Sequence, residues 1–172
     1  MRDFDCYTFS MSLRKLTSLF LGAVIIGVVF VAIPWLFVYL NNYFQLPIIS
    51  TPIFKIIGAV LICICLGIVF YSVLLHVNTG RFTPLPFIEH PQKFIYTGLY
   101  RYCRNPMYLT EIFLLFGVFF VFGHLLLLLY PFLFFLKVHF LVVFFEEPEL
   151  RKTFGESYLK YQNTVPRWLP KL

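Results

Sequence analysis

The segment Gly98-Leu-Tyr-Arg-Tyr-Cys-Arg-Asn-Pro-Met-Tyr108 separates a polar, proline-rich region from a long apolar one. Asn105 followed by Pro106 predicts the start of a helix. An asparagine side chain can accept a hydrogen bond from an orphan amide, and a proline at the first helical position gives up a bond that would go unmade there. We therefore expect a membrane-spanning helix to begin at Pro106, with its unpaired amides beside Arg101 and Arg104. Such a helix start can attract an anion, although a cap flanked by two interfacial arginines is also a complete explanation.

The composition is typical of a polytopic membrane protein. Hydrophobic residues make up 60% of the 172 residues and charged residues 13%, and the mean hydropathy is +0.83. Soluble domains carry about 25% charged residues. The length suffices for about four spans, so the sequence predicts an all-α transmembrane helix bundle that forms a single domain, residues 1–172. The net charge of +6 does not indicate nucleic-acid binding, because the cations flank apolar segments rather than forming a soluble basic face.

Residues 1–77 are expected to hold the first two spans. The apolar run Leu16–Leu40 is too long for a signal-peptide core, and Ile53–Leu75 is a second run of spanning length. The uncharged segment Asn41–Pro52 between them fits a short external loop. Met11 offers an alternative start, which would make the first ten residues a dispensable extension.

Residues 78–172 are expected to form the functional core, made of a loop, a helical hairpin and a C-terminal helix. The apolar stretch Met107–Phe145 would reach about 58 Å as one helix, roughly twice a bilayer core, so we expect a break at Gly123-His124. Beyond it, apolar residues recur at helical spacing and predict an amphipathic helix that lies on the membrane surface or folds back over the loop: Leu150, Phe154, Tyr158 and Tyr161.

The distribution of cations predicts the orientation. With four spans, 12 of the 14 lysines and arginines fall on one side of the membrane. The positive-inside rule makes that side cytosolic, and it contains both termini and the 76–106 loop. It also contains the Gly98–Tyr108 segment and the acidic pair Glu146-Glu147.

Adjacent glutamates at the end of a span are unusual. A carboxylate at a helix C-terminus is disfavoured by about 0.3–1 kcal/mol, which a cationic partner or a cationic ligand would offset. Solvation at the interface explains the pair equally well.

Glu111 and Lys137 lie within spans, where we expect a structural ion pair. The four cysteines do not suggest a disulfide framework, and no cluster has the spacing of metal ligands.

Several separated motifs resemble the bacterial branch of the isoprenylcysteine carboxyl methyltransferase-like integral membrane methyltransferases. They are Gly80-Arg-Phe-Thr-Pro-Leu-Pro86, Tyr100-Arg-x-x-Arg-Asn-Pro-Met-Tyr108, Glu146-Glu-Pro-x-Leu-Arg151 and Val165-Pro-Arg-Trp-Leu-Pro170. The Asn-Pro-Met-Tyr and Glu-Glu-Pro pieces are also similar to phosphatidylethanolamine N-methyltransferases. The resemblance covers about residues 78–170.

The resemblance implies that S-adenosylmethionine binds at the cytosolic ends of the last two spans and that its methyl group passes to a lipid or another lipophilic small molecule. The implied cofactor-binding residues are Phe94, Ile95, Tyr100, Asn105, Pro106, Met107, Tyr108 and Glu146. Arg104 would orient a carboxylate, and Glu147 is the candidate base for an amine substrate. A bacterial inner membrane is favoured over the endoplasmic reticulum.

Three positions depart from the family pattern. Asn105 stands where the prenylcysteine enzymes have histidine, Val142 stands where they have a substrate-binding arginine, and Thr110 replaces a glycine. The missing arginine argues against prenylcysteine as the substrate. Two alternatives stay open: an NADPH-dependent membrane reductase of the sterol-reductase kind, and a scaffold without catalysis. The sequence does not define the substrate, the methylated atom or the oligomeric state.

Overall fold

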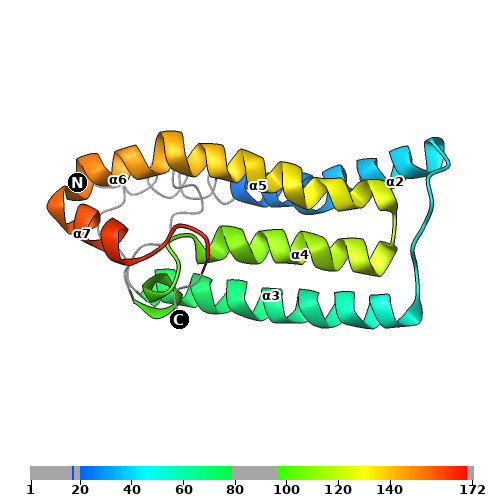
Figure 1. The fold of residues 1–172 in the computed structure, drawn as a ribbon, viewed down its shortest axis with the longest axis horizontal. Helices are drawn as coiled ribbons and strands as arrows, with labels where there is room; N and C mark the ends of the chain where they lie inside the picture. Colours follow the sequence, from blue (N-terminus) through cyan, green and yellow to red (C-terminus); the bar gives the residue numbers. More distant parts are fainter. Residues whose placement is uncertain (1–16, 18–19, 79–96, 170–172) are drawn as a thin grey trace, which may run out of the picture.

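The computed structural model describes Thr17 and residues 20–78 and 97–169, and these residues form a bundle of long helices. The long helices run side by side and alternate in direction along the chain (Figure 1). The predicted all-α class is confirmed, since the described residues contain helices and no β-strand. Phe94 and Ile95, which the resemblance placed in the cofactor site, lie outside the described residues.

The first helix runs from Phe20 to Tyr43 and widens into a π turn, η1 (Val28–Ala32), before it continues as α2 (Ile33–Tyr43). Pro34 accounts for the wide turn. A proline inside a helix cannot donate a hydrogen bond, and its ring collides with the carbonyl four residues earlier unless the helix widens or bends. The Tyr130 hydroxyl donates a hydrogen bond to the Val29 carbonyl oxygen at 2.8 Å and so ties this turn to a later helix.

The end of α2 corrects one prediction. The helix continues past Leu40, so Asn41 is a fully buried helical residue and not part of an external loop. Its side-chain oxygen accepts a hydrogen bond from the Leu126 amide at 2.9 Å, and its side-chain nitrogen donates to the Leu46 carbonyl at 3.0 Å. One buried amide therefore joins the first helix to the start of the last one.

Helix α3 (Pro52–Asn78) matches the predicted second span, and it packs closely and antiparallel against α4 (Pro106–Phe122). Glycines permit this approach. A Cβ atom built on Gly58 would lie 2.7 Å from the Gly117 carbonyl oxygen, well inside van der Waals contact. Small residues at a helix crossing are the usual means by which membrane helices pack closely.

The predicted break at Gly123-His124 is confirmed. Helix α4 ends at Phe122, Gly123 adopts a left-handed conformation (φ +69°), and the 3₁₀ turn η3 (Leu125–Leu128) follows directly. A side chain at Gly123 would collide with the Ile49 carbonyl, and the Ile49 amide donates to the Gly123 carbonyl at 2.7 Å. This turn therefore needs glycine both for its backbone angles and for its packing.

The last long helix consists of α5 (Leu129–Leu141), a second π turn η4 (Val142–Glu146) and α6 (Glu147–Phe154). After Glu146-Glu147 we predicted a single amphipathic helix, and this prediction is wrong in one respect. The helix is broken at Gly155 (φ +52°), and α7 (Glu156–Thr164) folds back. The predicted apolar stripe is confirmed, because Leu150, Phe154, Tyr158 and Tyr161 pack together with Val165.

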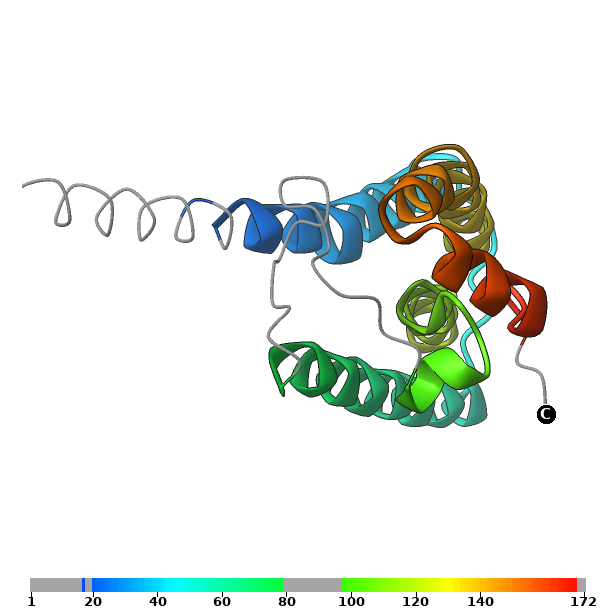
Figure 2. The same ribbon diagram turned by 90° about the vertical axis from the view of Figure 1, so that its left-hand side faces the viewer.

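Within the described residues, three helices are long and apolar enough to cross a membrane: Phe20–Tyr43, Pro52–Leu75 and Leu125–Phe154. Helix α4, at 17 residues, is shorter. Large apolar side chains cover the outer faces of the bundle, while Leu115, Tyr130, Phe134 and Val138 form the centre of the core. The end of the bundle at which α4 begins is covered by α6, α7 and the chain that follows them (Figures 1 and 2).

Candidate active site

Helix α4 begins as predicted, with Asn105 at the N-cap position and Pro106 at the first helical position. The expected side-chain cap is wrong. The Asn105 side-chain nitrogen donates instead to the Arg167 carbonyl at 3.2 Å, and among the described residues no side chain caps α4. The amides of the first helical turn are thus left for water or for a ligand.

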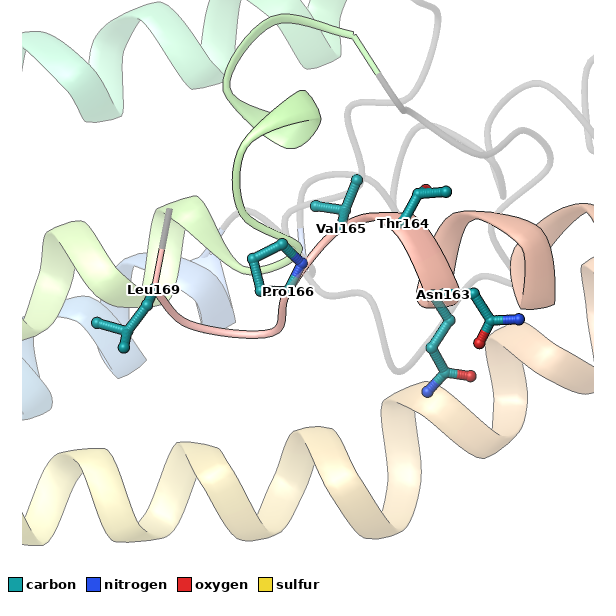
Figure 3. A pocket seen from close by; sticks show the side chains of 6 residues that line it. Asn163, Thr164, Val165, Pro166 and Leu169 are labelled. Carbon is teal, nitrogen blue, oxygen red and sulfur yellow. The ribbon is translucent and has the colours of Figure 1, made fainter. Parts of the chain in front are cut away.

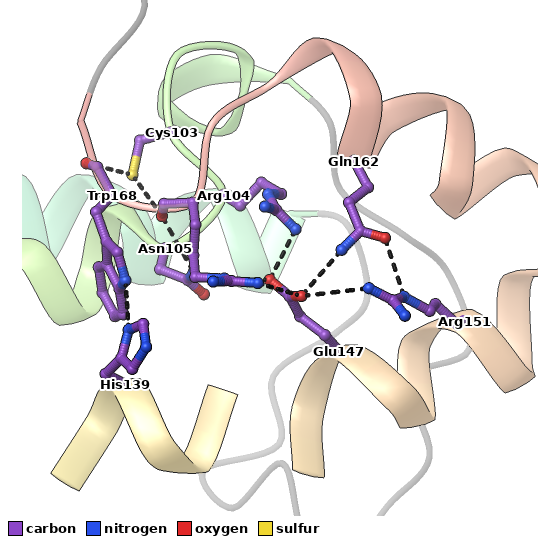
Figure 4. Close-up of polar contacts among 9 residues, drawn as sticks. Cys103, Arg104, Asn105, His139, Glu147, Arg151, Gln162 and Trp168 are labelled. Atoms are coloured by element: carbon purple, nitrogen blue, oxygen red, sulfur yellow. Dashed lines mark hydrogen bonds and ion pairs between the residues drawn. The ribbon is translucent and has the colours of Figure 1, made fainter. Parts of the chain in front are cut away.

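The chain after α7 lies across this helix start as a strap, which we define as Val165–Leu169. The Arg104 amide donates to the Pro166 carbonyl at 2.9 Å, and the Cys103 thiol donates to the carbonyls of Arg167 and Trp168 at 3.3 and 3.2 Å (Figure 4). Burial raises the pKa of Cys103, so this thiol acts as a structural donor rather than as a nucleophile.

Trp168 anchors the far end of the strap. Its indole nitrogen donates to Nδ1 of His139 at 3.0 Å, and its ring packs edge-on against Phe135 with 5.2 Å between ring centroids. The indole N–H can only donate, so Nδ1 of His139 is the acceptor of this hydrogen bond. The Nδ1 atom of His139 is therefore engaged in a hydrogen bond with the strap.

Glu147 is the centre of the polar network in Figure 4. Its carboxylate is 3% exposed and accepts hydrogen bonds from Arg104 Nη1 at 2.7 Å, from Arg167 Nε and Nη2 at 2.7 and 2.9 Å, and from Gln162 Nε2 at 2.9 Å. Arg151 Nη2 lies 3.7 Å away. Charge-assisted bonds of this kind stabilise the ionised carboxylate and fix its position. The prediction that Glu147 acts as a base does not fit these contacts, because its oxygens already accept bonds from several cations.

Glu146 lies in a different environment, although it is the next residue. Its carboxylate accepts a short hydrogen bond from the Tyr108 hydroxyl, which joins η4 to the first turn of α4. Among the described residues, none of the ion pairs includes Glu146. The described partner of its carboxyl group is therefore a neutral phenol rather than a cation.

Tyr100 belongs to the same neighbourhood. It lies in the 3₁₀ turn η2 (Gly98–Arg101), and its carbonyl accepts a hydrogen bond from the Tyr161 hydroxyl of α7 at 2.7 Å. Burial raises the pKa of Tyr100, and the Glu146 carboxylate adds to this shift. Thus Tyr100, Tyr108 and Glu146, predicted from two separate motifs, come together at one end of the bundle.

Other predicted residues are placed differently. The ion pairs of the described residues do not join Glu111 to Lys137, whose side chain is exposed and holds its Nζ 5.6 Å from the centre of the Phe134 ring. Val142 is a buried apolar residue at the position of the missing arginine. Pro106 is buried at the helix start and Met107 is half-buried.

The sequence reasoning missed Arg167 and Gln162 as partners of Glu147. Arg167 belongs to the C-terminal motif. It lies 20 residues beyond Glu147 in the sequence, so no local pattern indicates the contact between them. A usable signal was present for Arg151, which follows Glu147 by four residues on a helix and matches the spacing of a helical ion pair.

A hollow of about 410 Å³ lies beside the strap and opens widely to the surface (Figure 3). It is lined by Gln162, Asn163, Thr164, Val165, Pro166 and Leu169. A small-molecule site normally buries most of its ligand, which this hollow cannot do. We therefore place the candidate site at Tyr108 and Glu146, on the evidence of their side-chain chemistry.

Comparison with known proteins identifies the family. The model of one family, phospholipid methyltransferase, matches residues 53–157, which is more than half of the chain. The chain belongs to the phospholipid methyltransferase family. The match runs from α3 to the start of α7 and includes Tyr108, Glu146 and Glu147, whereas the strap lies beyond it. No individual curated protein matches the chain. Family membership and the long apolar helices together identify an integral membrane protein of a methyltransferase family.

Proposed function

We propose that this protein transfers a methyl group from S-adenosylmethionine to a lipid or another membrane-delivered small molecule. The observation that carries the proposal is the Tyr108–Glu146 contact at the uncapped start of α4. It brings a carboxylate that has no ion-pair partner among the described residues to the first turn of α4, where no described side chain caps the helix. A ligand with both cationic and anionic groups suits such a site.

The residues present fit S-adenosylmethionine. Its carboxylate suits the first-turn amides of α4, where the helix dipole favours negative charge. Its ammonium and sulfonium groups suit Glu146 and the faces of Tyr100 and Tyr108, which can attract a cation. When bound, the cofactor supplies a methyl group on a positively charged sulfur. Asn105, Pro106 and Met107 would line the pocket at the helix start.

The chain's own contribution is positioning and exclusion of water. We assign Glu147 the role of holding Arg104 in place, so that Arg104 can orient the substrate. The strap, fixed at Asn105 and His139, would cover the pocket. Because Glu147 is engaged by arginines, removal of a proton from an amine substrate falls to Glu146 or to water.

We further propose four spans, with α4 as the third. Its 17 residues reach about 25 Å, close to the thickness of a bilayer core, and it packs along α3. Both termini and the site would then face the cytosol, in keeping with the position of most cations, and a bacterial inner membrane remains the favoured location.

Isothermal calorimetry on nanodisc-embedded protein tests the cofactor assignment. S-adenosylmethionine should bind, and both Glu146→Gln and Tyr108→Phe should weaken binding at least tenfold, since each removes a charge or hydroxyl at the site. Glu156→Gln, on the exposed start of α7, is the matched control and should bind normally. Binding of NADPH instead would indicate a reductase. If the folded protein binds neither S-adenosylmethionine nor NADPH, the hypothesis of a scaffold without catalysis is the one that stands.

A further inference from the structure

The outer end of the strap is attached through the side chain of Trp168. Its indole nitrogen donates to Nδ1 of His139 at 3.0 Å, and both side chains are half-buried (Figure 4). The two rings lie 6.0 Å apart between centroids, and Phe135 contacts both, at 5.8 Å from His139 and 5.2 Å from Trp168. Leu169, the next residue, is 80% exposed. The contact with His139 is therefore the last attachment of the strap within the described residues.

The attachments at the inner end of the strap do not change between about pH 5 and 8, the range in which histidine titrates. Backbone carbonyls of the strap accept hydrogen bonds from the Arg104 amide, the Asn105 side chain and the Cys103 thiol. Burial raises the pKa of Cys103, so the thiol keeps its proton in that range. The Arg167 guanidinium holds Glu147, whose carboxylate several cations stabilise in its ionised form. In the described part of the chain, the dependence on a histidine is confined to the outer end.

The bond between Trp168 and His139 requires a neutral imidazole. An indole N–H can only donate, and a protonated imidazole carries an N–H on both nitrogens, so it offers no acceptor. Protonation of His139 therefore removes the acceptor and sets two donors against each other. Histidine is the side chain whose charge ordinarily changes between about pH 5 and 8. Acid thus breaks the outer attachment while the inner ones persist.

Other titratable or charged side chains lie on the elements around His139. They are Tyr108 and Glu111 on α4, Lys137 on α5, Glu146 and Glu147 at the end of the same long helix, Cys103 and Arg104 ahead of α4, and Arg167 on the strap. The described hydrogen bonds and ion pairs join none of them to the side chain of His139 or of Trp168. A titration of one of these groups would act on the strap through its field, and so it would persist when His139 is replaced.

We propose that the Trp168–His139 bond is a pH-sensitive latch, closed while His139 is neutral and opened by its protonation. The open form binds one proton more than the closed form, so acid favours opening and alkali favours closure. Because the inner attachments persist, the strap turns about Pro166 and Arg167 and stays on the bundle. Trp168 and Tyr108 pack against the same buried cluster, so the latch lies beside the candidate site. Control of cofactor exchange by the latch rests on the proposed function, whereas the latch itself does not.

Nuclear magnetic resonance of the full-length protein in micelles, labelled with ¹⁵N-tryptophan, tests the latch directly. The chain has two tryptophans, and Trp35, which is 71% exposed on α2, is the internal control. Loss of one indole N–H signal in Trp168→Phe assigns the other. His139→Gln keeps an acceptor oxygen for the indole at every pH in the range, and His139→Phe removes the acceptor. Far-ultraviolet circular dichroism checks that each variant stays folded at each pH.

We expect the Trp168 indole signal to move as the pH falls from about 8 to about 5, toward the position that His139→Phe shows at both values. The Trp168 signal of His139→Gln and the Trp35 signal should stay in place. A Trp168 signal that does not move, or that moves as far in His139→Gln, would overturn the latch.

The dissociation rate of S-adenosylmethionine, measured on the same samples, tests the consequence for the site. Loss of one hydrogen bond corresponds to about a tenfold change, so dissociation should be about tenfold faster at the acid end in the unchanged protein and less than twofold faster in His139→Gln. Equal acceleration in both proteins would overturn the control of cofactor exchange. If the indole responds as expected while S-adenosylmethionine does not bind at either pH, the latch stands and the proposed methyl transfer fails.

Discussion

The adjacent residues Glu146 and Glu147 should respond oppositely to the same substitution. Glu147 is 3% exposed and accepts three hydrogen bonds from two arginines that are 10% and 28% exposed. Glu147→Gln keeps the shape but replaces an anionic acceptor with an amide whose NH₂ group faces guanidinium groups. Removing one partner of a buried ion pair costs about 3–5 kcal/mol. Because Arg167 is partly solvated, we expect the lower end, about 3 kcal/mol of unfolding free energy.

Glu146→Gln should leave stability within about 1 kcal/mol, because the amide oxygen can still accept the hydrogen bond from Tyr108. It should nevertheless weaken cofactor binding at least tenfold, since the carboxylate is gone. The folded fraction of the Glu147→Gln variant should keep part of its affinity for the cofactor. The reason is that Glu147 contacts arginines and does not contact Tyr108 or Glu146.

Reversible unfolding in mixed micelles, followed by far-ultraviolet circular dichroism and paired with calorimetry, separates the two effects. Adding Arg104→Gln to Glu147→Gln should cost less than the sum of the single variants, since the two side chains form one contact. A loss below about 1 kcal/mol for Glu147→Gln, or equal losses for Glu146→Gln and Glu147→Gln, would refute the distinction drawn between them.

Three further predictions follow from the packing. Gly58→Ala should destabilise the α3–α4 contact by about 1–3 kcal/mol in the same unfolding assay, whereas Gly67→Ala, on the same helix with open space around it, should be neutral or stabilising by up to about 1 kcal/mol. Asn41→Ala should cost about 1–3 kcal/mol because it strands the Leu126 amide, and the exposed Asn42→Ala should have little effect. Cys103 should react slowly with maleimide at pH 7, because burial raises its pKa and lowers its thiolate fraction, and mass spectrometry should show fast modification only after unfolding.

The membrane-spanning elements were predictable from the sequence because the bilayer imposes simple rules. A helix must be long, apolar and internally hydrogen-bonded, so the second span and the break at Gly123 followed from length and composition alone. The end of α2 was missed because Asn41 looks like a loop residue until its partner, the Leu126 amide, is known. The side-chain bond of Asn105 was missed for the same reason, since the Arg167 carbonyl lies far along the chain. Local patterns predict which groups need partners but not which distant groups supply them.

The π turns show where local reasoning ends. The first and the last of the long helices each contain a five-residue π turn that ends two residues before a proline. These turns are η1, before Pro34, and η4, before Pro148. The sequence shows each proline but does not show whether the helix kinks, breaks or widens around it. At η4 the answer decides the chemistry. The π turn sets the rotation at which Glu146 and Glu147 leave the helix, and adjacent residues point about 100° apart, so Glu146 contacts Tyr108 while Glu147 contacts Arg104. Two identical side chains thereby acquire different surroundings: one bonds to a phenol, and the other is held by a set of arginines.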